Sequence, residues 1–199
     1  GGSRTARCPG HRKENFMAIS LEKNQGVNLT KVFPNLHSIQ VCMEWGQNDL
    51  DVETFLLENT NKVSCDSDLV YYNNKVHSSG AVIHTGDAQH GGSERVDVNL
   101  TMLPSHITTV VITSTIYTKE DKNINFGSSG NAKILVIDAE SKETIIDCNL
   151  SEDFFTSSSV IICRFEKTEN GWIFRRIEES VDGDLAKLCN MFGVKVKHS

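Results

Sequence analysis

The chain is dominated by short segments in which apolar and polar residues alternate, and turn residues separate these segments. Alternation with a period of two indicates a β-strand with one buried face, whereas an amphipathic helix has a period near 3.6. Residues 109–117, TVVITSTIY, are the clearest example, because β-branched side chains suit a pleated, half-buried surface. Further strands are expected at Ile19–Leu21, Val27–Leu29, Ser38–Trp45, Leu50–Leu57, Leu69–Tyr72, Val82–Ile83, Val96–Leu100, Ala132–Ile137 and Thr144–Asn149. The pattern restricts the chain to a β-rich fold.

The strongest local signal lies near the C-terminus, in VIICRFEKTENGWIFRRIEES. Asn170 and Gly171 stand between two alternating runs, and both residue types accept the positive φ values that a type I′ turn requires. The sequence therefore predicts a β-hairpin with a type I′ turn at this dipeptide.

A short helix is expected after this hairpin. Asp182 is a candidate N-cap, Gly193 is a candidate C-terminal stop, and one apolar stripe lies between them: Leu185, Leu188, Cys189 and Phe192. With about ten strands and few helical stretches, the simplest architecture is two packed antiparallel sheets. The sequence predicts an all-β fold, a two-sheet antiparallel β-sandwich with a short C-terminal helix.

The length of 199 residues suits one domain. Residues 1–16 are basic and unpatterned, and alternation begins at Met17. We expect residues 1–16 to be a tail, either disordered or added to the natural start, and residues 17–199 to form a single β-sandwich domain.

The charge and the cysteines favour some partners and compartments over others. A formal net charge of -6 without a dense Lys/Arg block argues against nucleic acid as a partner. No apolar run is long enough to span a bilayer, although peripheral membrane association through a partner stays open. The six cysteines are scattered, with no CxxC pair, and no apolar leader is present. We therefore expect reduced thiols and a cytoplasmic location.

Two acidic stretches are candidates for cation binding. Asp49 and Asp51 are two apart on an expected strand, so both carboxylates project from one face. Asp87 lies in a glycine-rich turn, and Glu94 follows just before the next strand. Ca²⁺ is the natural ligand, because it takes six to eight oxygens from carboxylates and carbonyls. From the residues alone, a solvated strand face and an ordinary hairpin loop remain the alternatives.

Nine tracts occur along the chain in this order: MAISLEKNQGVNLTK, NDLDVETFLL, SDLVYYNN, AVIHTGD, VVITSTIY, the Phe126-Gly127 turn, LSED, ENGWIFRRI and DLAKLCNMFGV. In order and spacing, this set resembles the TerD family of tellurium-resistance and stress proteins, from Met17 to Val194. The resemblance implies a calcium-binding β-sandwich that acts in tellurite resistance and broader stress, alongside other stress-response proteins, with no catalytic activity.

Carried over residue by residue, the family's D-L-D tract falls on Asp49, Leu50 and Asp51. Its G-D-N tract falls on residues 86–88, where Ala replaces the Asn, and its G-D-D-E tract falls on residues 91–94, where both central acids are absent. The resemblance thus implies a metal site built from Asp49, Asp51, Asp87 and Glu94. The loop is shorter and poorer in acids than the family pattern, and Ca²⁺ affinity falls with ligand charge.

Two other classes of function stay open beside a stress-response binding protein. One is a metal-free scaffold that presents a sheet face to a protein partner. The other is a small-molecule binder or hydrolase that uses His84 or His90, which predicts a deep pocket beside those loops. A zinc site from His77, His84, His90 and Cys65 is disfavoured, because their separations match no compact ligand pattern.

Overall fold

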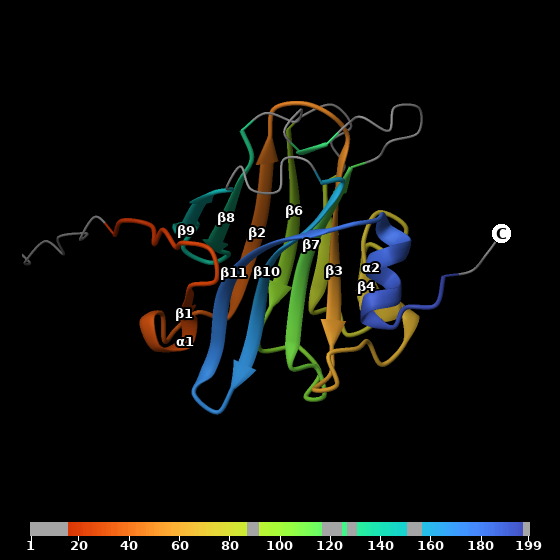
Figure 1. Ribbon diagram of the computed structural model, residues 1–199. Coiled ribbons are helices and arrows are strands. Elements are labelled where there is room, and N and C mark those ends of the chain that lie inside the picture. Colours follow the sequence, from red (N-terminus) through yellow and green to blue (C-terminus); the bar gives the residue numbers. More distant parts are fainter. Residues whose placement is uncertain (1–15, 87–91, 117–124, 127–130, 151–156, 197–199) are drawn as a thin grey trace, which may run out of the picture.

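The computed structural model describes residues 16–86, 92–116, 125–126, 131–150 and 157–196, which form two packed sheets (Figure 1). One sheet has six strands in the order β1 (Gly26–Asn28), β11 (Gly171–Val181), β10 (Ser159–Thr168), β7 (Thr109–Ile116), β3 (Leu50–Leu57) and β4 (Leu69–Val70). The other has five, in the order β5 (Val82–Thr85), β6 (Gly92–Asn99), β2 (Ser38–Trp45), β8 (Lys133–Asp138) and β9 (Thr144–Asn149). All neighbouring strands in both sheets are antiparallel. The predicted all-β sandwich is confirmed.

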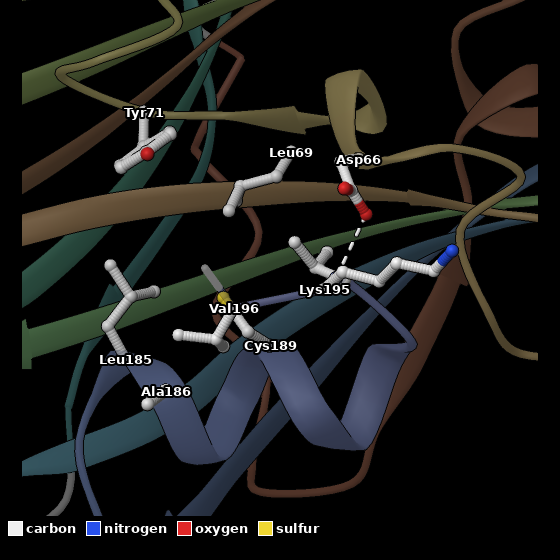
Figure 2. Close-up of a pocket in the computed structure, with 9 residues that line it drawn as sticks. Asp66, Leu69, Tyr71, Leu185, Ala186, Cys189, Lys195 and Val196 are labelled. Atoms are coloured by element: carbon white, nitrogen blue, oxygen red, sulfur yellow. Dashed lines mark hydrogen bonds between the residues drawn. The ribbon is translucent and has the colours of Figure 1, made fainter. Parts of the chain in front are cut away.

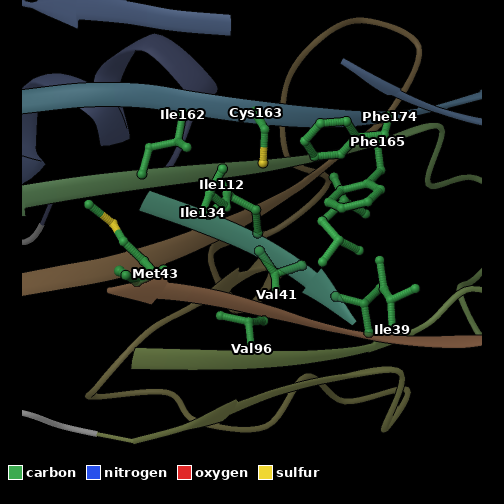
Figure 3. Close-up of a cluster of buried hydrophobic side chains, with 14 of the residues drawn as sticks. Ile39, Val41, Met43, Val96, Ile112, Ile134, Ile162, Cys163, Phe165 and Phe174 are labelled. Carbon is green, nitrogen blue, oxygen red and sulfur yellow. The ribbon is translucent and has the colours of Figure 1, made fainter. Parts of the chain in front are cut away.

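The main core fills the space between the sheets (Figure 3). The five-stranded sheet contributes alternate residues of its strands, including Val41 and Met43 of β2 and Ile134 of β8. The six-stranded sheet contributes side chains such as Phe165 and Phe174. Their rings pack edge to face, with centroids 5.2 Å apart. Burial of alternate side chains on both sheets produces the period of two seen in the sequence.

A second apolar cluster covers the outer face of the six-stranded sheet, where helix α2 (Leu185–Phe192) lies beside β3 and β4 (Figure 1). The rings of Phe55 on β3 and Phe192 on α2 are 4.8 Å apart. Because β3 is buried on both faces, its sequence ends in the continuous run Phe55, Leu56 and Leu57 instead of alternating.

The N-cap predicted for this helix was wrong by two residues. Asp184, not Asp182, accepts hydrogen bonds from the backbone N–H groups of Ala186 and Lys187. Gly183 separates the two aspartates and has a φ of 147°. The C-terminal prediction is confirmed, since Gly193 ends the helix in the left-handed conformation, with a φ of 82°.

The predicted hairpin forms between β10 and β11, but its turn is not type I′. Gly171 has a φ of 101°, whereas Asn170 does not have a positive φ. Gly171 is required for a second reason, because a Cβ there would lie 2.3 Å from the side chain of Thr30. Thr30 belongs to helix α1 (Leu29–Val32), so the glycine lets the hairpin approach that helix closely.

The two predicted strands nearest the N-terminus differ from those in the structure. Leu29 was expected to end a strand, but Asn28 accepts the N–H of Lys31 and starts α1 there. The expected strand Ile19–Leu21 is reduced to a single bridge between Ile19 and Ile146. Both segments line the sheet border, where tertiary packing decides local structure.

The described ranges bear on two expectations, about membrane spans and about the cysteines. No helix there is both long enough and apolar enough to cross a membrane. The described cysteines form no disulfide; they are Cys42, Cys65, Cys148, Cys163 and Cys189.

Candidate functional site

Asp49 and Asp51 lie at the end of the sandwich where β2 ends and β3 begins. Asp49 follows Asn48, whose φ of 69° turns the chain and whose carbonyl accepts the Trp45 indole N–H at 3.0 Å. Asp51 is paired with Thr115 of β7, and its carbonyl accepts the Ser114 hydroxyl at 2.8 Å. Both aspartates are half-buried. The strand start that carries them is therefore well fixed.

Glu94 reaches the same end of the molecule from the other sheet. Its side chain faces the interior with Val96 and Val98 and is 1% exposed. Its Oε2 atom accepts the backbone N–H of Val52 at 2.8 Å and lies 3.7 Å from His84 Nε2. Strand β4 pairs with Thr54 and Phe55 of β3, so within the described ranges no strand reaches this N–H on that side. Glu94 supplies the missing acceptor and ties β6 to β3.

The position of Asp87 lies outside the described residues, as does that of His90. The described flanks are Gly86 and Gly92, with φ values of 126° and 138° that only glycine adopts freely. Gly92 is paired with Trp45 at the end of β2. Among the residues that the structure describes, no three His, Cys, Asp or Glu side chains gather as metal ligands.

The histidines considered for zinc have other contacts. His77 bonds to Asp68, and His84 lies beside Glu94. The structure thus places His77 and His84 in two separate polar clusters, and Cys65 contacts Ser67 instead of either histidine.

One of these clusters, Asp68, His77 and Ser79, was not foreseen. The Nε2 atom of His77 lies 2.9 Å from Asp68 Oδ1, and its Nδ1 atom lies 2.7 Å from Ser79 Oγ. Asp68 and His77 are each 3% exposed, while Ser79 is half-buried. The three side chains therefore form a continuous acid, imidazole and hydroxyl chain.

Hydrogen bonds hold Asp68 as a carboxylate in this chain. Burial opposes ionisation, but donors from Ser64, His77 and the backbone of Ser64 and Cys65 outweigh it and lower the pKa of Asp68. Oδ2 alone accepts the Ser64 N–H at 2.9 Å, the Ser64 hydroxyl at 2.6 Å and the Cys65 N–H at 3.2 Å. Asp68 belongs to the short 3-10 helix η1 (Asp66–Asp68), which these bonds close.

A second buried carboxyl, Glu53, lies beneath helix α2 on the outer face of β3. The hydroxyls of Thr113 and Thr115 donate to its two oxygens at 2.6 and 2.5 Å. Burial raises the pKa of Glu53 to about 8, although these hydrogen bonds act in the opposite direction. Glu53 therefore holds a proton at neutral pH, which avoids an ion within the apolar cluster.

A cavity of about 480 Å³ opens beside α2 (Figure 2). Its apolar walls come from β4, α2 and the C-terminal segment, and include Leu69, Leu185 and Val196. Asp66 lies at one end, where its Oδ1 accepts the backbone N–H of Lys195 at 2.9 Å. Burial raises the pKa of the Cys189 thiol to about 11, so this wall residue is uncharged at neutral pH. No deep pocket was expected at this place; the hydrolase alternative put one beside His84 and His90.

Comparison with known proteins agrees with this architecture. The model of the TerD domain matches residues 17–192. The chain belongs to the TerD family. It is 35% identical to the uncharacterized protein YceE of Bacillus subtilis (strain 168) over 90% of this chain and 100% of that protein. It is 33% identical to general stress protein 16U of the same organism, over the same shares of both chains.

Similarity extends to a named resistance protein and to a solved structure. The chain is 30% identical to tellurium resistance protein TerD of Serratia marcescens, over 89% of this chain and 98% of that one. The crystal structure of a TerD homologue from Streptomyces coelicolor A3(2) superposes with a TM-score of 0.65 at 15% identity, covering 82% of this chain and 100% of that chain. The solved structure supports the TerD-type fold, and the sequence relatives place the chain among tellurium-resistance and stress-response homologues.

Sequence reasoning missed the Asp68 cluster because its members carry no local signature. Asp68 and His77 are nine residues apart, and only His77 and Ser79 are close in sequence. Glu53 was missed for a different reason: an alternating strand predicts that Glu53 faces solvent, whereas the structure buries it on the face of β3 that α2 covers.

Proposed function

We propose that this chain is a stress-response protein whose loop end, marked by Asp49 and Asp51, binds Ca²⁺ weakly and performs no catalysis. Its similarity to general stress protein 16U and to a tellurium resistance protein supports the stress-response part. We expect it to act in the cytoplasm with other stress-response proteins. We assign a binding role to this end because carboxylate oxygens are ligands that Ca²⁺ prefers.

The hydrogen bond from Val52 N–H to Glu94 carries the metal part of the proposal. This 2.8 Å contact holds the start of β6 against the start of β3. Residues 87–91, which include Asp87, connect to the start of β6 at Gly92. Asp51 and Glu94, more than forty positions apart in the sequence, thus lie on strand ends that this hydrogen bond brings together.

The donor set limits the affinity. Asp49 and Asp51 offer two described carboxylates, whereas Ca²⁺ takes six to eight oxygens. Glu94 already uses Oε2 for Val52 and faces inward, so it acts mainly as a positioning residue. Asp87, backbone carbonyls and water would supply the remaining oxygens. We therefore expect a Kd in the millimolar range, like that of extracellular modules with few ligand charges.

Calcium titration of the full chain, by calorimetry and by thermal unfolding, tests this proposal. At ten times Kd, binding to the folded state adds about 1.4 kcal/mol to the free energy of unfolding. The D49N/D51N variant should lose both the heat and the stabilisation. A charge-matched control, E140Q/E169Q, removes two exposed carboxylates from the opposite end and should bind like wild type.

Three outcomes decide between the candidate functions. Loss of binding in D49N/D51N alone supports the calcium site. Equal loss in both variants indicates a general charge effect and contradicts the site. No binding by wild type at 20 mM CaCl₂ (about 20 times the expected Kd) contradicts the proposal and favours the metal-free scaffold.

A further inference from the structure

The Asp68, His77 and Ser79 chain lies at the end of the sandwich opposite Asp49 and Asp51. Ser79 precedes β5, whose first residue, Val82, pairs with Val98 near the end of β6. That end of β6 pairs with the start of β2, whereas Asp49 follows the end of β2. Any chemistry at Ser79 is therefore separate from the proposed calcium site.

The hydrogen bonds define the direction in which a proton can move. The backbone N–H of Ser79 donates to His77 Nδ1 at 3.2 Å, so this nitrogen carries a lone pair. The His77 proton is then on Nε2 and is donated to the Asp68 carboxylate at 2.9 Å. The Ser79 hydroxyl, 2.7 Å from Nδ1, faces a base that the carboxylate orients.

A tight hairpin holds this arrangement in place. The His77 N–H donates to the Val82 carbonyl at 2.9 Å, and the Gly80 N–H donates to the His77 carbonyl at 2.8 Å. The Ala81 N–H donates to Ser79 Oγ itself at 3.1 Å. This last contact fixes the position of Oγ beside His77.

The two residues after Ser79 also line a cavity of about 260 Å³ on the five-stranded sheet. Gly80 and Ala81 form part of its wall together with the apolar residues Ile83 and Met102 and with polar residues such as Gln40 and Asp97. Met102 is 51% exposed, so the cavity is open to solvent. Its volume suits a small acyl or aryl group, and its wall begins one residue after Ser79.

We propose that Ser79 is an activated nucleophile that takes acyl groups from small apolar esters, with His77 as its general base and Asp68 as the residue that orients His77. The observation behind this is the joint presence of the hydrogen-bonded chain and the adjacent cavity. The proposed substrates are esters with a good leaving group, because their acyl transfer depends least on donors to the developing oxyanion.

The reaction balances without a cofactor. Oγ of Ser79 attacks the ester carbonyl while its proton passes to His77 Nδ1; the new Oγ–C bond forms and the C–O bond to the leaving alcohol breaks. The alcohol leaves with the proton from His77. Water then attacks the acyl group, gives one proton to His77 and releases the carboxylic acid, and the proton returns to Ser79 Oγ.

Two probes test this with the full chain. An alkyl fluorophosphonate should phosphonylate Ser79 with release of HF, which intact mass and peptide mapping detect. 4-Nitrophenyl acetate should give a burst of nitrophenol of up to one equivalent, followed by slow turnover. S79A should abolish both signals. S78A is the matched control, because Ser78 is the exposed neighbour of Ser79, and it should react like wild type.

Substitution of the base separates activation from simple exposure of a serine. H77Q should slow acylation of Ser79 by about 100-fold or more, as expected for loss of a general base. D68N should slow it less, and thermal unfolding should show that each variant is folded at the assay temperature. If H77Q does not fold, S79C keeps the test decisive, because a thiol at this position should retain the burst. Labelling of S79A at the wild-type rate, labelling at another residue, or no reaction of wild type would overturn the proposal.

Discussion

The outer faces of the two sheets differ in what covers them and in the residues they carry. On the six-stranded sheet, α2 covers Phe55, Val111 and Ile161, and the face has become a second core. On the five-stranded sheet, no helix in the described part of the chain covers the outer face, which carries polar residues such as Gln40 and Arg95. Lys133 and Asp147 pair there at 3.4 Å while both remain partly exposed.

The difference shows that one short helix changes which strand positions are buried, and therefore which residues a strand needs there. Each sheet needs only one apolar face to build the sandwich. The second apolar face on β3 and β7 is buried, and so adds to stability, because α2 packs on it. The same cover encloses a carboxyl, Glu53, that would otherwise be hydrated. Stability and pH dependence should therefore concentrate on the covered face.

Phe192→Ala should have the largest effect. Phe192 is 1% exposed and packs on Phe55, so its truncation leaves a cavity under α2 and costs about 3–5 kcal/mol of the free energy of unfolding. Leu135→Ala, on the half-buried open face, is the matched control and should cost about 1 kcal/mol or less. Urea denaturation measures both. Similar losses for the two variants would contradict the contrast between the faces.

Glu53→Gln should remove a pH dependence. The folded-state pKa of about 8 lies above the ordinary value, so the unfolded chain releases this proton first as pH rises. The contribution of Glu53 to stability is complete below its unfolded pKa and is lost by the time pH passes 8. The wild-type free energy of unfolding should thus fall by about 4 kcal/mol between pH 5 and pH 9 through this group. Denaturation of E53Q across that range should show a flatter profile; an unchanged profile would contradict burial as the cause.

Asp184→Ala should have the smallest effect of the three, about 1 kcal/mol, because it removes the N-cap of α2. Asp182→Ala is its control and should change stability by less than about 0.5 kcal/mol. The melting temperatures of the two variants show whether Asp184, the N-cap in the structure, or Asp182, the N-cap predicted from the sequence, stabilises α2. A larger effect at Asp182 would favour the sequence prediction.

Much of the fold could be predicted because its strands have one face in the main core. Residues such as Val41 and Met43 alternate with polar neighbours, and that period is visible in any single strand. The border segments were less predictable. Asn28 can continue a strand or cap a helix, and the approach of Thr30 to Gly171 selects the helix.

The candidate sites were predictable to different degrees. Asp49 and Asp51 share one tract, so they could be proposed together from the sequence. The contact between Glu94 and Val52 joins two sheets, and nothing in either strand alone indicates it. Asp68 and His77 come together because the connection between β4 and β5 folds back on itself. The spacing of residues along the sequence gives no sign of this contact.

The hydrogen bond from Val52 N–H to Glu94 also disfavours self-association of this protein through the edge of β3. A strand border with unsatisfied N–H groups can recruit a strand from another chain, and such contacts begin aggregation. Because β4 covers so little of β3, that border would be open beside Thr54. A buried carboxylate occupies it from within the same chain, so the molecule can keep β4 short without offering β3 as a template for self-association.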